Sequence, residues 1–226
     1  MLPILGARPS CVQAQDLAVD VDLRATRRLL AGGEEQTVAI QTQTRISNEA
    51  YARLALAEPD RKWELWDGVP REKPGMTAAH NYFGAKLGFM LMSQLDWSSF
   101  EVRIDSVRVQ RSQTTFFIPD LVVVPAEYVS DIFDEPGILE SYSQPLPLSA
   151  EVWSRTTGDF DIGEKLRTYH RRGDAEIWFL HPYERTLRSS ARQPDGKYFE
   201  ALYREGLVRP HALPNVEIDL AVLFAR

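Results

Sequence analysis

Glu151 is the residue of this sequence whose position points most strongly to chemistry. It lies in the middle of residues 148–154, an apolar segment that begins after Pro147 and predicts a buried strand. A carboxylate removed from water must be paired, protonated or bound to a cation. Glu151 is therefore the first candidate for a catalytic or metal-binding side chain.

Lys165 is expected to meet Glu151 from the next element. The sequence predicts a helix from about Phe160 to Arg172, which ends at Gly173 as a left-handed cap. The inward stripe of this helix consists of Ile162, Leu166 and Tyr169, and Lys165 falls on the same stripe. An ammonium and a carboxylate thus point from consecutive elements into one interior region.

Asp120 adds a second carboxylate from further upstream. It stands at the mouth of residues 118–124, a nearly continuous apolar run that is typical of an interior strand. Two carboxylates on neighbouring strands, with a lysine from the next helix, can hold a hard divalent cation and a phosphate. The pattern predicts Asp120 and Glu151 as metal ligands, with the backbone carbonyl of Val152 as a further oxygen ligand.

These residue types suit the hydrolysis of a phosphodiester bond. The reaction needs charge relief on the phosphate, an activated water and a stabilised leaving alkoxide. One or two Mg²⁺ ions, or Mn²⁺ as a substitute, can supply the first two. Lys165 would then contact the phosphate or the attacking water.

The composition limits the class of protein. A chain of 226 residues, in which no apolar run approaches the roughly 20 residues of a membrane span, predicts one globular domain and no membrane partner. Cys11 is the single cysteine, which excludes an internal disulfide and a cysteine-rich zinc site and favours the cytoplasm. The formal charge of -6 argues against broad electrostatic capture of nucleic acid but leaves room for a local basic groove.

The order of patterns along the chain predicts an α/β domain at residues 37–226. Residues 1–15 show no period and residues 16–30 are compatible with a short amphipathic helix, so for residues 1–36 we expect a weakly ordered N-terminal extension, or residues ahead of the native start. The expected elements besides those already described are a helix at 47–57, a hairpin at 62–73, a helix at 77–95, a strand at 100–110 with a bulge near Asp105-Ser106, a strand at 175–180, an added β-hairpin at 186–203 and a short strand and helical turn at 216–224.

Glu64 and His80 are weaker candidates for the site. Glu64 alternates away from Trp63 and Leu65 in the predicted hairpin, and a lone acid in such a strand is typical of a solvent-facing residue. His80 lies in the first turn of the predicted 77–95 helix. There it would either point toward a phosphate at the helix N-terminus or pair with a neighbouring acid.

The order of these motifs resembles the Uma-two family of restriction endonucleases, a branch of the PD-(D/E)xK nuclease superfamily. The resemblance covers about Ile46 to Phe224. It is carried by Trp63-Glu64-Leu-Trp-Asp67-Gly68, His80, Pro119-Asp120, Glu151-Val-Trp-Ser154, Asp161, Lys165 with Tyr169, and Glu176-Ile-Trp178. The position two residues after Glu151, where the superfamily has its lysine, holds Trp153. The family similarly takes its lysine from the following helix, here Lys165.

The resemblance implies a restriction-endonuclease-like fold, in which a mixed β-sheet is flanked by helices. It also implies Mg²⁺, nuclease chemistry on DNA and frequently a homodimer. Glu64 and His80 become outer members of the site in this assignment.

Two functions from different classes remain as hypotheses. The first is a Mg²⁺-dependent DNA endonuclease with Asp120, Glu151 and Lys165 at its centre. The alternative is a non-catalytic dimeric binding or assembly module that keeps the nuclease fold, with Glu151 and Lys165 as a buried ion pair. Hydrolysis of another phosphoester fits the same residues. The lack of a Gly-x-Ser-x-Gly elbow argues against a Ser/His/Asp hydrolase.

Overall fold

The structure is a computed structural model that describes residues 44–155 and 158–226, without the side chains of residues 158–162. The predicted extension at residues 1–36 lies outside the described residues. Among the described residues, every helix is too short or too polar to cross a lipid bilayer. The elements are α1 (Asn48–Ala57), β1 (Trp63–Trp66), β2 (Val69–Glu72), α2 (Ala78–Met92), β3 (Phe100–Ile104), β4 (Arg108–Ser112), β5 (Thr115–Phe117), β6 (Leu121–Pro125), α3 (Ala126–Ser130), β7 (Ser141–Tyr142), β8 (Leu148–Val152), α4 (Gly158–Arg172), β9 (Glu176–His181), β10 (Thr186–Arg192), β11 (Tyr198–Tyr203), β12 (Leu207–Val208), β13 (Ile218–Asp219) and α5 (Leu220–Phe224).

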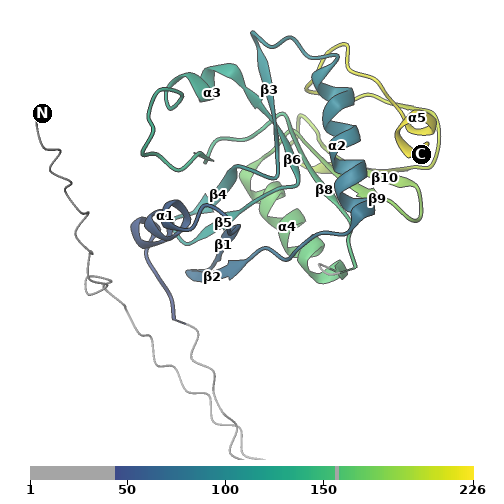
Figure 1. The fold of residues 1–226 in the computed structure, drawn as a ribbon. Coiled ribbons are helices and arrows are strands. Elements are labelled where there is room, and N and C mark those ends of the chain that lie inside the picture. Colours follow the sequence, from purple (N-terminus) through teal and green to yellow (C-terminus); the bar gives the residue numbers. More distant parts are fainter. Residues whose placement is uncertain (1–43, 156–157) are drawn as a thin grey trace, which may run out of the picture.

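The main sheet has six strands in the order β11-β10-β9-β8-β6-β3. Strands β8 and β9 are parallel, with α4 as the crossover between them, and the other pairs are antiparallel. The predicted hairpin at 186–203 is present as β10 and β11 and extends this sheet at one edge. The expected mixed sheet flanked by helices is therefore confirmed (Figure 1).

A second sheet of five strands, in the order β2-β1-β5-β4-β7, accompanies the first. The turn of its β1–β2 hairpin has positive φ at both Asp67 (47°) and Gly68 (87°), as a two-residue turn of this kind requires. The predicted single strand at 100–110 is wrong in one respect. Asp105 has a φ of 50° and ends β3, so the chain leaves the main sheet and enters the second sheet as β4, where the prediction had a bulge.

Two apolar cores lie on opposite faces of the main sheet. On one face, Leu87 and Leu91 of α2 and Leu223 of α5 pack against Trp178 and the other inward residues of the central strands. On the other face, Tyr169 of α4 packs with Val109, Phe117 and Tyr142 of the second sheet. Figure 1 shows α2 and α5 together on one side, with α4 and the second sheet away from them. Glu151 lies between these layers, because β8 is buried on both faces.

Two helix ends fix elements that carry site residues. Thr77 is the N-cap of α2, since its side-chain oxygen accepts a hydrogen bond from the backbone N–H of His80. The C-terminal end of α4 is closed by Gly173, whose φ of 82° matches the predicted left-handed cap. Arg172, the last residue of α4, is buried and donates to the carbonyl oxygens of Gln110, Tyr142 and Gln144. The orientation of α4 is thereby tied to the second sheet and to the connection after β7.

Candidate active site

Asp120 lies just before β6 and is 3% exposed. Its Oδ1 accepts a hydrogen bond from Lys73 Nζ at 2.6 Å. Its Oδ2 accepts from the backbone N–H of Val152 at 2.7 Å and contacts His80 Nε2 at 2.8 Å. Burial by itself raises the pKa of Asp120, but the charges of Lys73, His80 and Lys165 outweigh this effect and hold the pKa well below its usual range. Asp120 is therefore an ionised carboxylate placed directly beside β8.

Glu151 projects from β8 toward α4 and is 4% exposed. Its Oε1 accepts a hydrogen bond from the Tyr169 hydroxyl, and both of its oxygens lie 3.4 Å from Lys165 Nζ. Burial is the largest cause that raises the pKa of Glu151 to about 7, and Asp120 contributes in the same direction, while Lys165 opposes it. The two carboxyl groups thus differ, because Asp120 is held as an anion and Glu151 titrates near neutrality.

Lys165 reaches the same interior region from α4, with a side chain that is 7% exposed. Its Nζ lies 3.1 Å from Glu64 Oε1, in addition to its contacts with Glu151, and 3.5 Å from the Ile118 carbonyl. Burial alone lowers the pKa of an ammonium, but the charges of Glu151, Glu64 and Asp120 hold the pKa of Lys165 well above its usual value. Lys165 is therefore a permanent cation at neutral pH.

Glu64 is buried rather than solvent-facing, so the expectation from strand alternation is wrong for this residue. It is 4% exposed, and its Oε1 accepts from the backbone N–H of Ile118 at 2.9 Å while its Oε2 accepts from the Trp66 indole at 3.0 Å. The alternation argument failed because β1 lies inside the second sheet, where both of its faces are covered at this point. Glu64 joins the cluster as the partner of Lys165.

His80 pairs with a neighbouring acid, one of the two roles considered for it. The acid is Asp120, and His80 Nδ1 lies 3.3 Å from the Asn81 side-chain oxygen. Burial lowers the pKa of His80, but the hydrogen bond and charge of Asp120 outweigh this and the pKa is raised. His80 therefore orients Asp120 Oδ2 from the first turn of α2.

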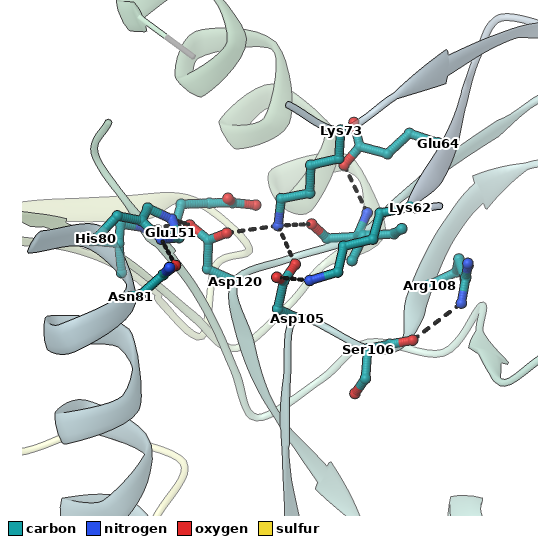
Figure 2. A network of polar contacts seen from close by, with 12 residues as sticks. Lys62, Glu64, Lys73, His80, Asn81, Asp105, Ser106, Arg108, Asp120 and Glu151 are labelled. Carbon is teal, nitrogen blue, oxygen red and sulfur yellow. Dashed lines mark hydrogen bonds and ion pairs between the residues drawn. The ribbon is translucent and has the colours of Figure 1, made fainter. Parts of the chain in front are cut away.

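Lys73 and Asp105 also belong to the cluster, and the sequence argument missed both. Figure 2 shows the Lys73 ammonium among Asp120, Asp105 and the rest of the network. Lys73 Nζ lies 2.7 Å from Asp105 Oδ1 and 3.0 Å from the Ile118 carbonyl, and its side chain is 2% exposed. A lysine at the end of a hairpin and an acid at a strand break are ordinary surface residues by pattern. Their place in the cluster becomes visible only in the tertiary structure, where the end of the hairpin and the break after β3 come close together.

Comparison with known families decides what kind of protein carries this cluster. The sequence model of the Uma2 family, described as "Putative restriction endonuclease", matches residues 48–222. The chain belongs to the Uma2 family. The match runs from α1 to α5, which confirms the family and the extent inferred from the motifs. No curated protein is significantly similar to the chain.

A solved structure shares the fold of this Uma2 protein. It is the crystal structure of "a putative nuclease belonging to DUF820" from Anabaena variabilis, with a TM-score of 0.60. The likeness covers 72% of this chain and 89% of that chain, at 15% sequence identity. At this identity the similarity establishes the fold alone.

The residues of this Uma2 site suit a hard divalent cation by donor chemistry. Carboxylate oxygens are the preferred ligands of Mg²⁺, and each such oxygen has two acceptor positions. In the contacts between described residues, Asp120 Oδ1 and Glu151 Oε2 each have one partner, an ammonium in both cases. Among the described residues, however, no three His, Cys, Asp or Glu side chains form a ready-made metal cluster. A divalent cation therefore fits the donors but competes for them with the lysines.

Glu151 makes the stability of the metal-free protein depend on pH. Its pKa is about 7 in the folded chain against 4.5 for an ordinary glutamate, so the folded state binds more protons between these values. The stability from this group is present at acid pH and is lost as the pH rises through 7. We expect the free energy of unfolding, measured with urea in EDTA, to fall more between about pH 5 and about pH 8 in the wild type than in Glu151→Gln. Equal falls in both proteins would contradict this.

Proposed function

We propose that the chain is a Mg²⁺-dependent endonuclease that hydrolyses phosphodiester bonds in DNA. The observation that carries the proposal is the meeting of Asp120, Glu151 and Lys165, from three separate segments, in one buried cluster. Asp120 and Glu151 would hold the metal ion, with the carbonyl oxygen of Val152 as a further ligand. The description of the Uma2 family supports DNA as the substrate.

The bound cation would relieve charge on the phosphate and activate a water molecule. Asp120 supplies a fixed negative charge, because Lys73 and His80 hold its pKa low. Lys165 stays protonated, so it acts by attraction of the phosphate or by orienting the attacking water rather than by removing a proton. Tyr169 and Glu64 position Glu151 and Lys165. Glu64 and His80 are thus positioning residues in this mechanism.

A plasmid assay tests the proposed function. We expect purified protein to convert supercoiled DNA to nicked or linear DNA with Mg²⁺ or Mn²⁺ and to lose this activity in EDTA. Restoration of cleavage by excess Mg²⁺ would show that the loss reflects metal removal. Cleavage that persists in EDTA, or a folded protein without cleavage under any of these metals and several DNA forms, would contradict the proposal. Gel filtration of the same sample tests the homodimer that the family resemblance implies.

A second candidate function is favoured by one observation. The oxygens of Asp120 and Glu151 are already hydrogen-bonded or paired within the protein, and Lys165 lies within 3.4 Å of Glu151. The same contacts would exist in a dimeric binding or assembly module that keeps the fold without turnover. Such a module would bind no divalent cation at Asp120, so metal binding separates the two functions.

A further inference from the structure

The Lys73 ammonium occupies a position that resembles a cation site. Three oxygens surround its Nζ: Asp120 Oδ1 at 2.6 Å, Asp105 Oδ1 at 2.7 Å and the Ile118 carbonyl at 3.0 Å. The contacts of Lys165 Nζ are longer, at 3.1 to 3.5 Å. Of the two buried ammonium groups, Lys73 is therefore the one held tightly against the carboxylate that the proposed metal would use.

The cluster already contains several positive charges, so the two charges of a divalent cation would be repelled there. The described part of the cluster contains the carboxyl groups of Glu64, Asp105, Asp120 and Glu151 and the ammonium groups of Lys62, Lys73 and Lys165. A divalent ion next to Asp120 would face the Lys73 charge at close range in a buried environment. Repulsion of this kind is weakly screened away from water. One of the two cations must leave Asp120 Oδ1.

We propose that Lys73 is an internal competitor of the divalent cation at Asp120, so that metal binding requires the Lys73 ammonium to move off Asp120 Oδ1. This inference rests on the proposed function, because it needs the metal to bind at Asp120. Lys73 keeps the ionised Asp120 neutralised when no metal is bound. The apparent affinity for the metal is reduced by the fraction of molecules in which Lys73 occupies the oxygen.

A neighbouring cavity offers a place for the displaced ammonium. The cavity has a volume of about 300 Å³, and its charged lining consists of Lys73 itself, Lys62, Asp60, Glu72 and Asp105. Asp105 Oδ1 already pairs with Lys73 from this side, while its Oδ2 pairs with Lys62. Asp60 and Glu72 are further acids of the lining, and Glu72 pairs with Arg61. Lys73 can therefore move away from Asp120 while it keeps a carboxylate partner. A short movement of one flexible side chain would open the metal position.

Metal affinity provides the first test. Mn²⁺ is titrated by calorimetry into the wild type, Lys73→Met and the matched control Lys197→Met, whose side chain is 84% exposed and pairs only with Asp195 in the described contacts. Lys73→Met should bind Mn²⁺ about tenfold or more tightly than the wild type, and Lys197→Met should be unchanged. Lys73→Gln, which keeps a donor for the Ile118 carbonyl, replaces Lys73→Met if the apolar variant does not fold.

Amine labelling of the wild type provides an independent test. Mass spectrometry after brief acetylation compares each lysine with and without saturating Mn²⁺. Labelling of Lys73 should increase severalfold with Mn²⁺, whereas labelling of Lys197 should not. Unchanged labelling of Lys73, or equal Mn²⁺ affinity in wild type and Lys73→Met, would overturn the inference while the metal site stands. If neither the wild type nor any variant binds Mn²⁺, the proposed metal-dependent function fails as well.

Discussion

Glu151→Gln is expected to lower metal-dependent DNA cleavage by about 100-fold or more while the protein stays folded. A bound metal ion contributes several kcal/mol of charge stabilisation in the transition state, and loss of a carboxylate ligand would weaken that contribution; about 1.4 kcal/mol corresponds to a factor of ten in rate. Glutamine has nearly the same shape and can still accept the hydrogen bond from Tyr169. Because burial already raises the pKa of Glu151 to about 7, a neutral amide at this position should not cost stability.

The assay for Glu151→Gln combines plasmid cleavage with thermal unfolding at about pH 8, where the wild-type carboxylate is mostly ionised. The variant should melt at the wild-type temperature or higher, so a loss of activity is not a loss of fold. Glu127→Gln is the matched control, because Glu127 is exposed in the first turn of α3. A variant that cleaves as fast as the wild type would show that Glu151 is not a catalytic residue.

Lys165→Met is expected to destabilise the protein by about 3 to 5 kcal/mol at neutral pH. The substitution leaves the buried carboxyl groups of Glu64 and Glu151 without their shared cation. The pKa of Glu151 is already raised to about 7 by burial, so Glu151 can take up a proton at acid pH and the loss should be smaller at about pH 5 than at about pH 8. Urea denaturation at both pH values measures the effect, and Lys197→Met is the control at an exposed ion pair.

The double variant Glu64→Gln with Lys165→Met separates the stability lost with the Lys165 charge from the stability lost with the packing of its alkyl chain. Removal of one orphaned carboxylate should recover at least about 1 kcal/mol relative to Lys165→Met. No recovery would mean that Lys165 contributes mainly through its alkyl chain. Both proposed functions predict this loss of stability, since both contain the same buried ion pair. The single substitution of Lys165 therefore cannot distinguish an endonuclease from a binding module, whereas Glu151→Gln can.

Local sequence patterns predicted most helices and strands of the fold. The hairpin at 62–73, the helix that begins at about residue 77, the Gly173 helix end and the hairpin at 186–203 were all expected, because turn and cap preferences act over a few residues. The break at Asp105 was expected only as a bulge. A change of phase in an apolar pattern does not say whether the strand continues in the same sheet or enters another one.

The site residues also fall into those that local patterns predicted and those that they did not. Burial of Asp120, Glu151 and Lys165 was predicted because each lies on an apolar strand or stripe, where a charge needs a partner. The predicted helix residue Ile162, like Asp161, has a side chain outside the described residues. Glu64, placed in solvent by alternation, is buried because both faces of β1 are covered at this point.

The sequence alone determined the family, the order of elements and the three central charges, because these depend on short patterns and on which residues are apolar. The tertiary structure alone decided that Lys73 is the cation that holds Asp120. Lys73 and Asp120 are 47 positions apart in the chain, and no local preference records that the end of the β1–β2 hairpin lies against the start of β6. A pairing of this kind depends on how two sheets pack together, which is set by the whole domain at once.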